Sequence, residues 1–155
     1  MSASRLTFPR EARVSKIHFI SGLPRSGSTL LSALLRQNPR FEAGMSGPLA
    51  GLFDALLAKM SARNEFSVFL DDDKRQRILH GLFDNFYANH TAEVVFDTSR
   101  AWCGRMAALE RLFPEAKTIA CVREVSWVVD SIERLIQKNV FSPSSIFNYN
   151  PGGTV

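Results

Sequence analysis

The chain has 155 residues, of which 45% are hydrophobic and 22% charged, a composition typical of one globular domain rather than a disordered or fibrous chain. Its formal net charge of +4 suits an anionic ligand, yet no dense run of Lys and Arg with interleaved aromatic residues predicts a nucleic-acid surface. Two cysteines exclude a disulfide scaffold, and the three histidines do not cluster at metal-ligand spacing. With no stretch long enough to cross a bilayer, the sequence predicts a cytoplasmic protein without a metal site or membrane span.

The N-terminal part of the sequence predicts a lead-in, a strand, a turn and a helix. Residues 1–14 mix Ser, Arg and Pro without periodicity and are expected to be a flexible lead-in to a domain over residues 15–155. The apolar run 16–21 ends at Gly22 and predicts a buried strand. Leucines at helical spacing then predict a helix over 28–37, which Asn38-Pro39 stops.

The rest of the sequence alternates between helical and strand patterns. The acidic triplet 71–73 is interpreted as a solvated helix start, where carboxylates complement the helix dipole, rather than as a metal site. Helices are predicted over 49–60, 71–89, 101–113 and 126–138, strands over 93–97 and 117–122, and a loop from residue 142.

This alternation predicts an α/β fold: a three-layer parallel sheet with helices on both faces, of the phosphate-loop type. Trp102 and Trp127 are expected in its core, because both lie in predicted helices beside apolar neighbours. Only three strands are visible, and three apolar parallel strands normally have neighbours at their edges. We therefore expect the chain to end before its domain does, and the open sheet edge to favour pairing with a second copy.

The segment between the first strand and the first helix has the features of a phosphate-binding loop. Its sequence over residues 22–29 is GLPRSGST. Glycines allow a tight turn whose N–H groups point inward, and the helix start adds about half a positive charge. Three hydroxyl groups and one cation, Arg25, complete a cradle for a tetrahedral anion.

The loop differs from the pattern G-x-x-x-x-G-K-[ST] of nucleotide hydrolases. Gly22, Gly27 and Thr29 fit that pattern, but Ser28 stands at the lysine position and Arg25 lies three residues earlier. The lysine that usually binds the β- and γ-phosphates is therefore absent from this loop. The loop is expected to hold a 5′-phosphate, with a charge-assisted contact from Arg25 worth roughly 1.5–3 kcal/mol.

Residues 23–30, LPRSGSTL, resemble the 5′-phosphosulfate loop of sulfotransferases that use 3′-phosphoadenosine-5′-phosphosulfate (PAPS). The Pro-Arg-Ser-Gly form is similar to that of tyrosylprotein sulfotransferases and bacterial relatives, whereas cytosolic members carry Lys in place of Arg25. The resemblance covers about residues 15–155. It implies that the 5′-phosphosulfate is bound by Arg25, Ser26, Gly27, Ser28 and Thr29.

A second motif of that family is an Arg at a strand end followed by a Ser eight positions later. Arg123 ends the third predicted strand, and Ser131 follows at this spacing. The strand end and the second turn of the helix are expected at the same sheet edge as the loop. The resemblance implies that Arg123 and Ser131 bind the 3′-phosphate of PAPS, and that no metal is needed.

The general base is less clear from the sequence. Ser46 stands where tyrosylprotein sulfotransferases carry a Glu, and no His follows the second strand as in cytosolic members. The stretch from Asp97 to Trp102 instead resembles bacterial members. Asp97 is the candidate base, with Arg100 as a ligand contact, and Asp97→Asn is expected to abolish turnover while sparing nucleotide binding. The alternative, that Asp97 caps the next helix or pairs with Arg100, stays open.

The predicted activity is transfer of a sulfuryl group from PAPS to a hydroxyl or amine of a small molecule, peptide or sugar. The implied catalytic residues are Arg25, at the leaving oxygen, and Asp97. Two other readings remain: a small-molecule kinase or nucleotide hydrolase with a degenerate phosphate loop, and a non-catalytic nucleotide-binding module. The apolar run 94–96 ending in Asp97 resembles the metal-holding strand of the kinase class.

Overall fold

The computed structural model describes residues 16–61 and 65–138. The lead-in predicted over residues 1–14 and the loop predicted from residue 142 lie outside the described residues. No helix among the described residues combines the length and the apolar character needed to cross a lipid bilayer.

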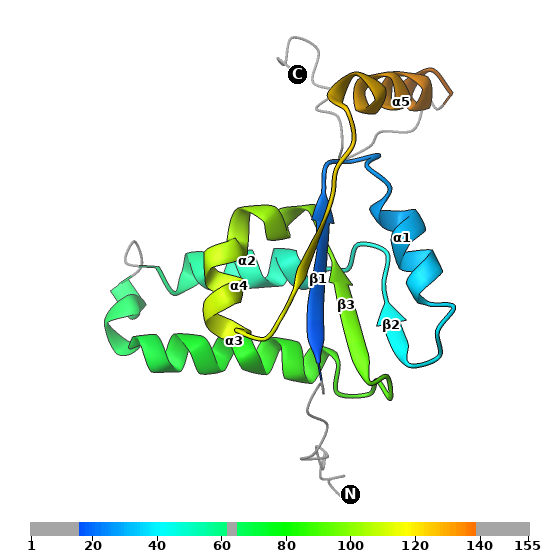
Figure 1. Ribbon diagram of the computed structural model, residues 1–155. Coiled ribbons are helices and arrows are strands. Elements are labelled where there is room, and N and C mark those ends of the chain that lie inside the picture. The colour runs from blue at the N-terminus through cyan, green and yellow to red at the C-terminus, as the bar shows by residue number, and fades with distance from the viewer. Residues whose placement is uncertain (1–15, 62–64, 139–155) are drawn as a thin grey trace, which may run out of the picture.

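The centre of the fold is a parallel four-stranded sheet with the strand order β2-β3-β1-β4 (Figure 1). Its strands are β1 (Ile17–Gly22), β2 (Phe41–Ala43), β3 (Val94–Thr98) and β4 (Thr118–Cys121). In the register, Ile20 pairs with Thr98 of β3 and Ile119 of β4. The carboxyl ends of β1, β3 and β4 therefore meet at one edge of the sheet.

Helices cover both faces of this sheet, which confirms the predicted α/β architecture (Figure 1). The chain passes from β1 over β3 to β2 and then returns, so right-handed connections place α1 on one face and α2, α3 and α4 on the other. The helices are α1 (Ser28–Leu35), α2 (Leu49–Lys59), α3 (Asp72–Phe86), α4 (Met106–Leu112) and α5 (Val125–Lys138), with 3₁₀ segments η1 (Glu65–Phe69) and η2 (Arg100–Arg105).

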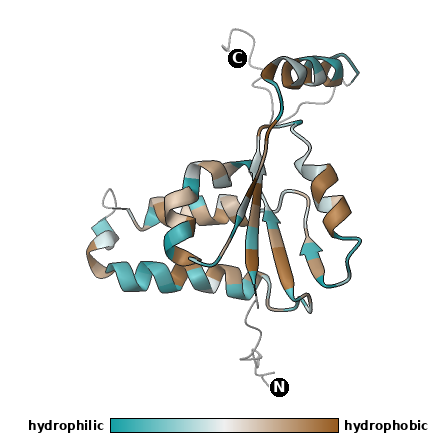
Figure 2. Cartoon of the chain, in the orientation of Figure 1, coloured by the Kyte–Doolittle hydropathy of each residue, from teal (hydrophilic) through white to brown (hydrophobic). Residues whose placement is uncertain are grey.

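The larger hydrophobic core lies between the sheet and the α2–α4 face. Phe19 of β1 is fully buried against the rings of Phe83 and Trp102, with ring centroids 6.0 and 5.4 Å away. A smaller core on the α1 face contains Ile20, Ala43 and Phe96. Figure 2 shows the apolar residues concentrated on the strands, whereas α3 is largely hydrophilic on the side in view.

The fourth strand, β2, is absent from the sequence-based prediction. It has only three residues, and Glu42 interrupts its apolar character, so it carries no strand pattern of its own. Pairing with β3 creates it: Phe41 lies opposite Val94, and Arg40 and Glu93 form an ion pair of 2.7 Å at its start.

Two further predictions need correction, and one holds. The helix predicted over 101–113 begins as the 3₁₀ segment η2 and becomes α-helical only at Met106. Trp102 is fully buried as expected, but Trp127 is 61% exposed, and the guanidinium of Arg123 lies 5.7 Å from the centre of its ring.

The acidic start of α3 is a helix cap, because Asp71 accepts a hydrogen bond of 2.8 Å from the N–H of Lys74.

Replacing Gly22 with Ala is expected to lower the free energy of unfolding by roughly 2–4 kcal/mol, since the backbone strain alone costs on the order of 1–3 kcal/mol. Gly22 has a φ of 153°, and an added Cβ would lie 2.4 Å from the carbonyl oxygen of Cys121. Urea denaturation followed by circular dichroism measures the change.

Gly51→Ala is the matched control for this substitution. Gly51 lies in α2 with open space around its Cα, so Ala there should raise the stability by about 0.5–1 kcal/mol. Equal stability changes for the two variants would contradict the close approach of Gly22 to β4.

Candidate functional site

The loop from Gly22 to Gly27 joins β1 to α1 at the carboxyl edge of the sheet. Arg25 has a left-handed backbone with a φ of 66°, and Gly27 follows at 105°. A hydrogen bond of 3.2 Å from the N–H of Ser26 to the carbonyl of Leu23 closes the turn. The connection after β1 leads to one sheet face and that after β3 to the other, so the loop lies where open α/β sheets form a ligand crevice.

The N-terminus of α1 is open for an anion. Gly27 is its N-cap residue and no side chain caps the helix, while the first N–H groups of an α-helix have no intrahelical acceptor. Within the described part of the chain, the buried hydroxyl of Ser26 has no hydrogen-bond partner. A Cβ built on Gly27 meets nothing within 4 Å. Unpaired N–H groups at a helix start, beside the open position at Gly27, suit a phosphate or sulfate group.

The structure brings three of the predicted site residues together. The Nε of Arg25 donates a hydrogen bond of 2.9 Å to the Oγ of Ser131, across 106 residues of sequence. Arg123 donates from Nη1 to the backbone carbonyl of Arg25 over 3.0 Å. These two bonds hold the start of α5 over the loop, where two guanidinium groups and a hydroxyl converge. Ser28 and Thr29 lie on the first turn of α1, beside this cluster.

Asp97, the candidate general base, is a buried residue. Its carboxylate is 3% exposed and accepts hydrogen bonds from the hydroxyl of Tyr87 at 2.5 Å and from the Nε1 of Trp102 at 2.6 Å. Among the described residues, its carboxylate neither caps a helix nor pairs with Arg100. A base must reach the acceptor directly or through one water, and here Tyr87 and Trp102 enclose the carboxylate, so the role of Asp97 as base stays a prediction.

The contact between Asp97 and Tyr87, together with their burial, shifts the pKa values of both side chains. Burial raises the pKa of Asp97, and the hydrogen bonds from Tyr87 and Trp102 partly oppose this rise. Burial, with the neighbouring carboxylate, also moves the pKa of Tyr87 far above its ordinary value. The phenol therefore remains protonated and acts as a fixed donor, which makes the three side chains a core hydrogen-bond network.

Three buried hydroxyl groups that the sequence analysis missed hold the site in place. The Oγ of Ser21 donates to the carbonyl of Ser99 at 2.8 Å and accepts from the N–H of Cys103 at 3.0 Å. The Oγ of Ser32 bonds to the Oγ1 of Thr98 at 3.0 Å and to the carbonyl of Ser28 at 3.0 Å. The signal available in the sequence was a hydroxyl residue at each apolar strand end, at Ser21 and Thr98.

The described ranges 16–61 and 65–138 contain no group of three or more His, Cys, Asp or Glu side chains arranged to hold a metal ion. Ser46, the position of the base in tyrosylprotein sulfotransferases, is exposed with a φ of 20°.

A family model described as "Sulfotransferase family" matches residues 18–150. This match covers most of the chain, from β1 through the loop to beyond α5, so the chain belongs to the sulfotransferase family. The resemblance inferred from the loop is thereby confirmed, and the fold and the family agree. Comparison with curated proteins gave no match.

Replacing Asp97 with Ala is expected to lower the free energy of unfolding by about 2–5 kcal/mol, because two buried donors lose their acceptor. Asp97→Asn should cost less, since its amide oxygen can accept from Trp102 while its NH₂ group donates to the oxygen of Tyr87. Thermal unfolding measured by calorimetry tests both variants.

Asp84→Ala is the control, because Asp84 is exposed on α3 and should change stability by less than about 0.5 kcal/mol. A fully stable Asp97→Ala protein that still binds nucleotide but has no turnover would restore Asp97 to a catalytic role.

Proposed function

We propose that this protein transfers a sulfuryl group from PAPS to a hydroxyl or amine acceptor. The observation that carries the proposal is the contact between Arg25 of the loop and Ser131 of α5, supported by Arg123. Membership of the sulfotransferase family supports the reaction class. The donor, the residues that bind it and the acceptor are our inference.

The loop would hold the 5′ end of the donor. Backbone N–H groups at the start of α1, the unpaired hydroxyl of Ser26 and the guanidinium of Arg25 are the groups available to the 5′-phosphosulfate. Gly27 leaves the space that the anion needs, and the hydroxyls of Ser28 and Thr29 lie on the same helical turn. Of these groups, the N–H donors at the start of α1 and the hydroxyl of Ser26 have no partner among the described protein groups.

Arg123 and Ser131 would hold the 3′-phosphate. Arg123 is exposed, and its guanidinium reaches a backbone carbonyl, the weaker type of partner for a cation. The hydroxyl of Ser131 faces the loop through its bond with Arg25. Phosphate oxygens would replace these partners, so binding of the donor would open the bond between Arg25 and Ser131.

When bound, PAPS supplies an activated sulfuryl group. The acceptor oxygen or nitrogen forms a bond to sulfur as the bond from sulfur to the bridging oxygen breaks, and 3′-phosphoadenosine-5′-phosphate (PAP) leaves. Arg25 would stabilise the negative charge that develops on the bridging oxygen, and the loop amides would fix the geometry. No step is assigned to Asp97, because its carboxylate is buried and occupied by two donors.

The kinase reading lacks support from the contacts. A kinase of the phosphate-loop class needs the lysine after Gly27, where this chain has Ser28, and a carboxylate at the end of β3 for magnesium. The carboxylate there, Asp97, is enclosed by Tyr87 and Trp102. Binding that requires magnesium would favour the kinase reading over ours.

PAP is expected to bind at least tenfold more tightly than AMP, which lacks the 3′-phosphate, because that group contacts Arg123 and Ser131. Arg123→Gln should remove most of this difference. Isothermal titration calorimetry without metal gives both affinities for each protein.

Arg134→Gln is the matched control, since Arg134 lies on α5 away from the loop and forms a surface ion pair of 3.1 Å with Asp130. If PAP and AMP bind equally to the unaltered protein, the proposed function is rejected.

Arg25→Gln is expected to weaken PAP binding by roughly tenfold to a hundredfold through loss of a charge-assisted contact. Arg25→Lys should retain part of the affinity, because it keeps the charge but loses the planar guanidinium that can bond to two anion oxygens. The unaltered protein should lose affinity as salt increases, and Arg25→Gln should show a shallower salt dependence. Equal salt dependence of the two proteins would contradict the role of Arg25.

A further inference from the structure

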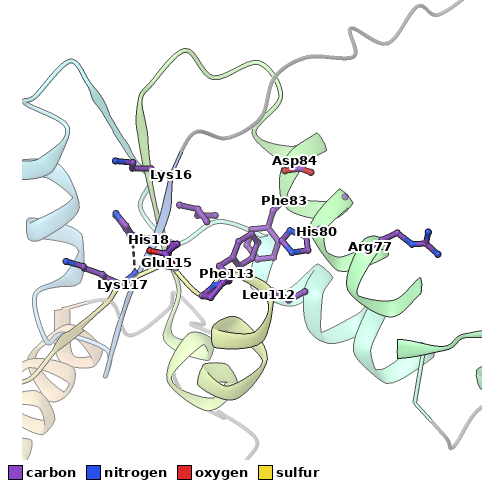
Figure 3. Close-up of a pocket in the computed structure, with 14 residues that line it drawn as sticks. Lys16, His18, Arg77, His80, Phe83, Asp84, Leu112, Phe113, Glu115 and Lys117 are labelled. Carbon is purple, nitrogen blue, oxygen red and sulfur yellow. Dashed lines mark hydrogen bonds between the residues drawn. The ribbon is translucent and has the colours of Figure 1, made fainter. Parts of the chain in front are cut away.

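A cavity of about 1210 Å³ opens at the amino end of β1, at the other end of the strand from the phosphate loop (Figure 3). Its walls are Lys16 and the first two residues of β1, one side of α3 and the segment 112–117 that leads into β4. β4 pairs with β1 only from Phe19 onward, which leaves the backbones of Ile17 and His18 without a strand partner on that side. None of the residues proposed to bind the nucleotide lines this cavity.

The middle of the cavity is aromatic. Figure 3 shows His80, Phe83 and Phe113 gathered there. The ring of Phe113 contacts that of Phe83 edge-to-face, and also that of His80, with 4.8 Å between centroids in both pairs. Such a surface offers ring faces and edges to a flat aromatic group.

One end of the cavity is basic. Lys16, His18 and Lys117 lie on the same side of the aromatic rings, with the carboxylate of Glu115 beside them (Figure 3). Neither lysine has an ion-pair partner within 4 Å among the described residues. The Nδ1 of His18 accepts a hydrogen bond of 3.1 Å from the N–H of Lys117, which leaves Nε2–H as a donor. Burial, followed by the charges of Lys117 and Lys16, lowers the pKa of His18.

We propose that this cavity binds an aromatic anion, with its ring against His80 and Phe113 and its carboxylate or sulfate between Lys16 and Lys117. Charge selects this occupant over the segment of the chain that precedes Lys16. Residues 1–15 carry three arginines and one glutamate, so the basic end would repel them. An aromatic anion can form ion pairs with the two lysines and pack its ring against the aromatic side chains.

The experiment compares 2-naphthoate and 2-naphthyl sulfate with the neutral 2-naphthalenemethanol by calorimetric titration of the full chain. We expect both anions to bind at least tenfold more tightly than the alcohol. In the variant with Lys16→Gln and Lys117→Gln together, the affinity for 2-naphthoate should fall about tenfold, the sum of two partly exposed charge contacts. The affinity for the alcohol should not change.

Two controls separate this site from the phosphate loop and from surface charge. Lys59→Gln with Lys138→Gln removes the same charge from exposed positions outside the cavity and should leave 2-naphthoate binding unchanged. Saturating PAP should not displace 2-naphthoate. Because an anion beside His18 favours its charged form, ligand binding should raise the pKa of His18, followed by proton NMR of its ring.

Equal affinity for the anions and the alcohol, unchanged binding in the Lys16 and Lys117 variant, or displacement by PAP would each overturn the proposal. Sedimentation velocity tests the remaining possibility, that a second copy of the chain occupies the cavity. If the protein self-associates and 2-naphthoate binds only to the monomer, a second copy occupies the cavity and the aromatic anion is not its ligand. The comparison of the anions with the alcohol and the lysine variants do not depend on PAP binding at the loop, so this inference and the proposed function can fail separately.

Discussion

The site depends on the carboxyl end of β1 being held on both sides. On one side, Ser21 bonds to the backbone of Ser99 and Cys103, which ties β1 to the turn after β3. On the other side, Gly22 lies so close to the carbonyl of Cys121 that only a residue without a Cβ fits. The loop therefore leaves the sheet at a fixed point between two neighbouring strands. Its position relative to Arg123, which follows β4, comes from this constraint.

Much of the fold could be predicted from sequence because its signals are local. The apolar run of β1, the glycines of the loop and the leucines of α1 each carry their own pattern, and together they predict a phosphate-loop fold. β2 could not be predicted in this way, because its three residues become a strand only through pairing with β3. Trp127 shows the same limit: its helix was predicted, but which side of α5 meets solvent depends on tertiary contacts.

The residues of the candidate site, like the strands and helices, could be predicted only in part from the sequence. Arg123 and Ser131 were expected at the same sheet edge as the loop because parallel strands end there, and each forms a hydrogen bond with Arg25. Asp97 was expected to point outward from the same edge, but side chains alternate between the faces of a strand. Asp97 pairs in register with Phe19, whose side chain lies in the larger core, and Tyr87 and Trp102 complete its surroundings there. A strand end specifies the edge, but not the direction in which each side chain points.

The left-handed backbone of Arg25 has a consequence for the energetics of binding. A residue other than glycine in this conformation carries a cost of order 1–3 kcal/mol, which the surrounding contacts must offset within the folded protein. That cost is met when the chain folds, not when a ligand arrives. An incoming anion therefore finds the turn already shaped, and less of its interaction energy is spent on ordering the protein.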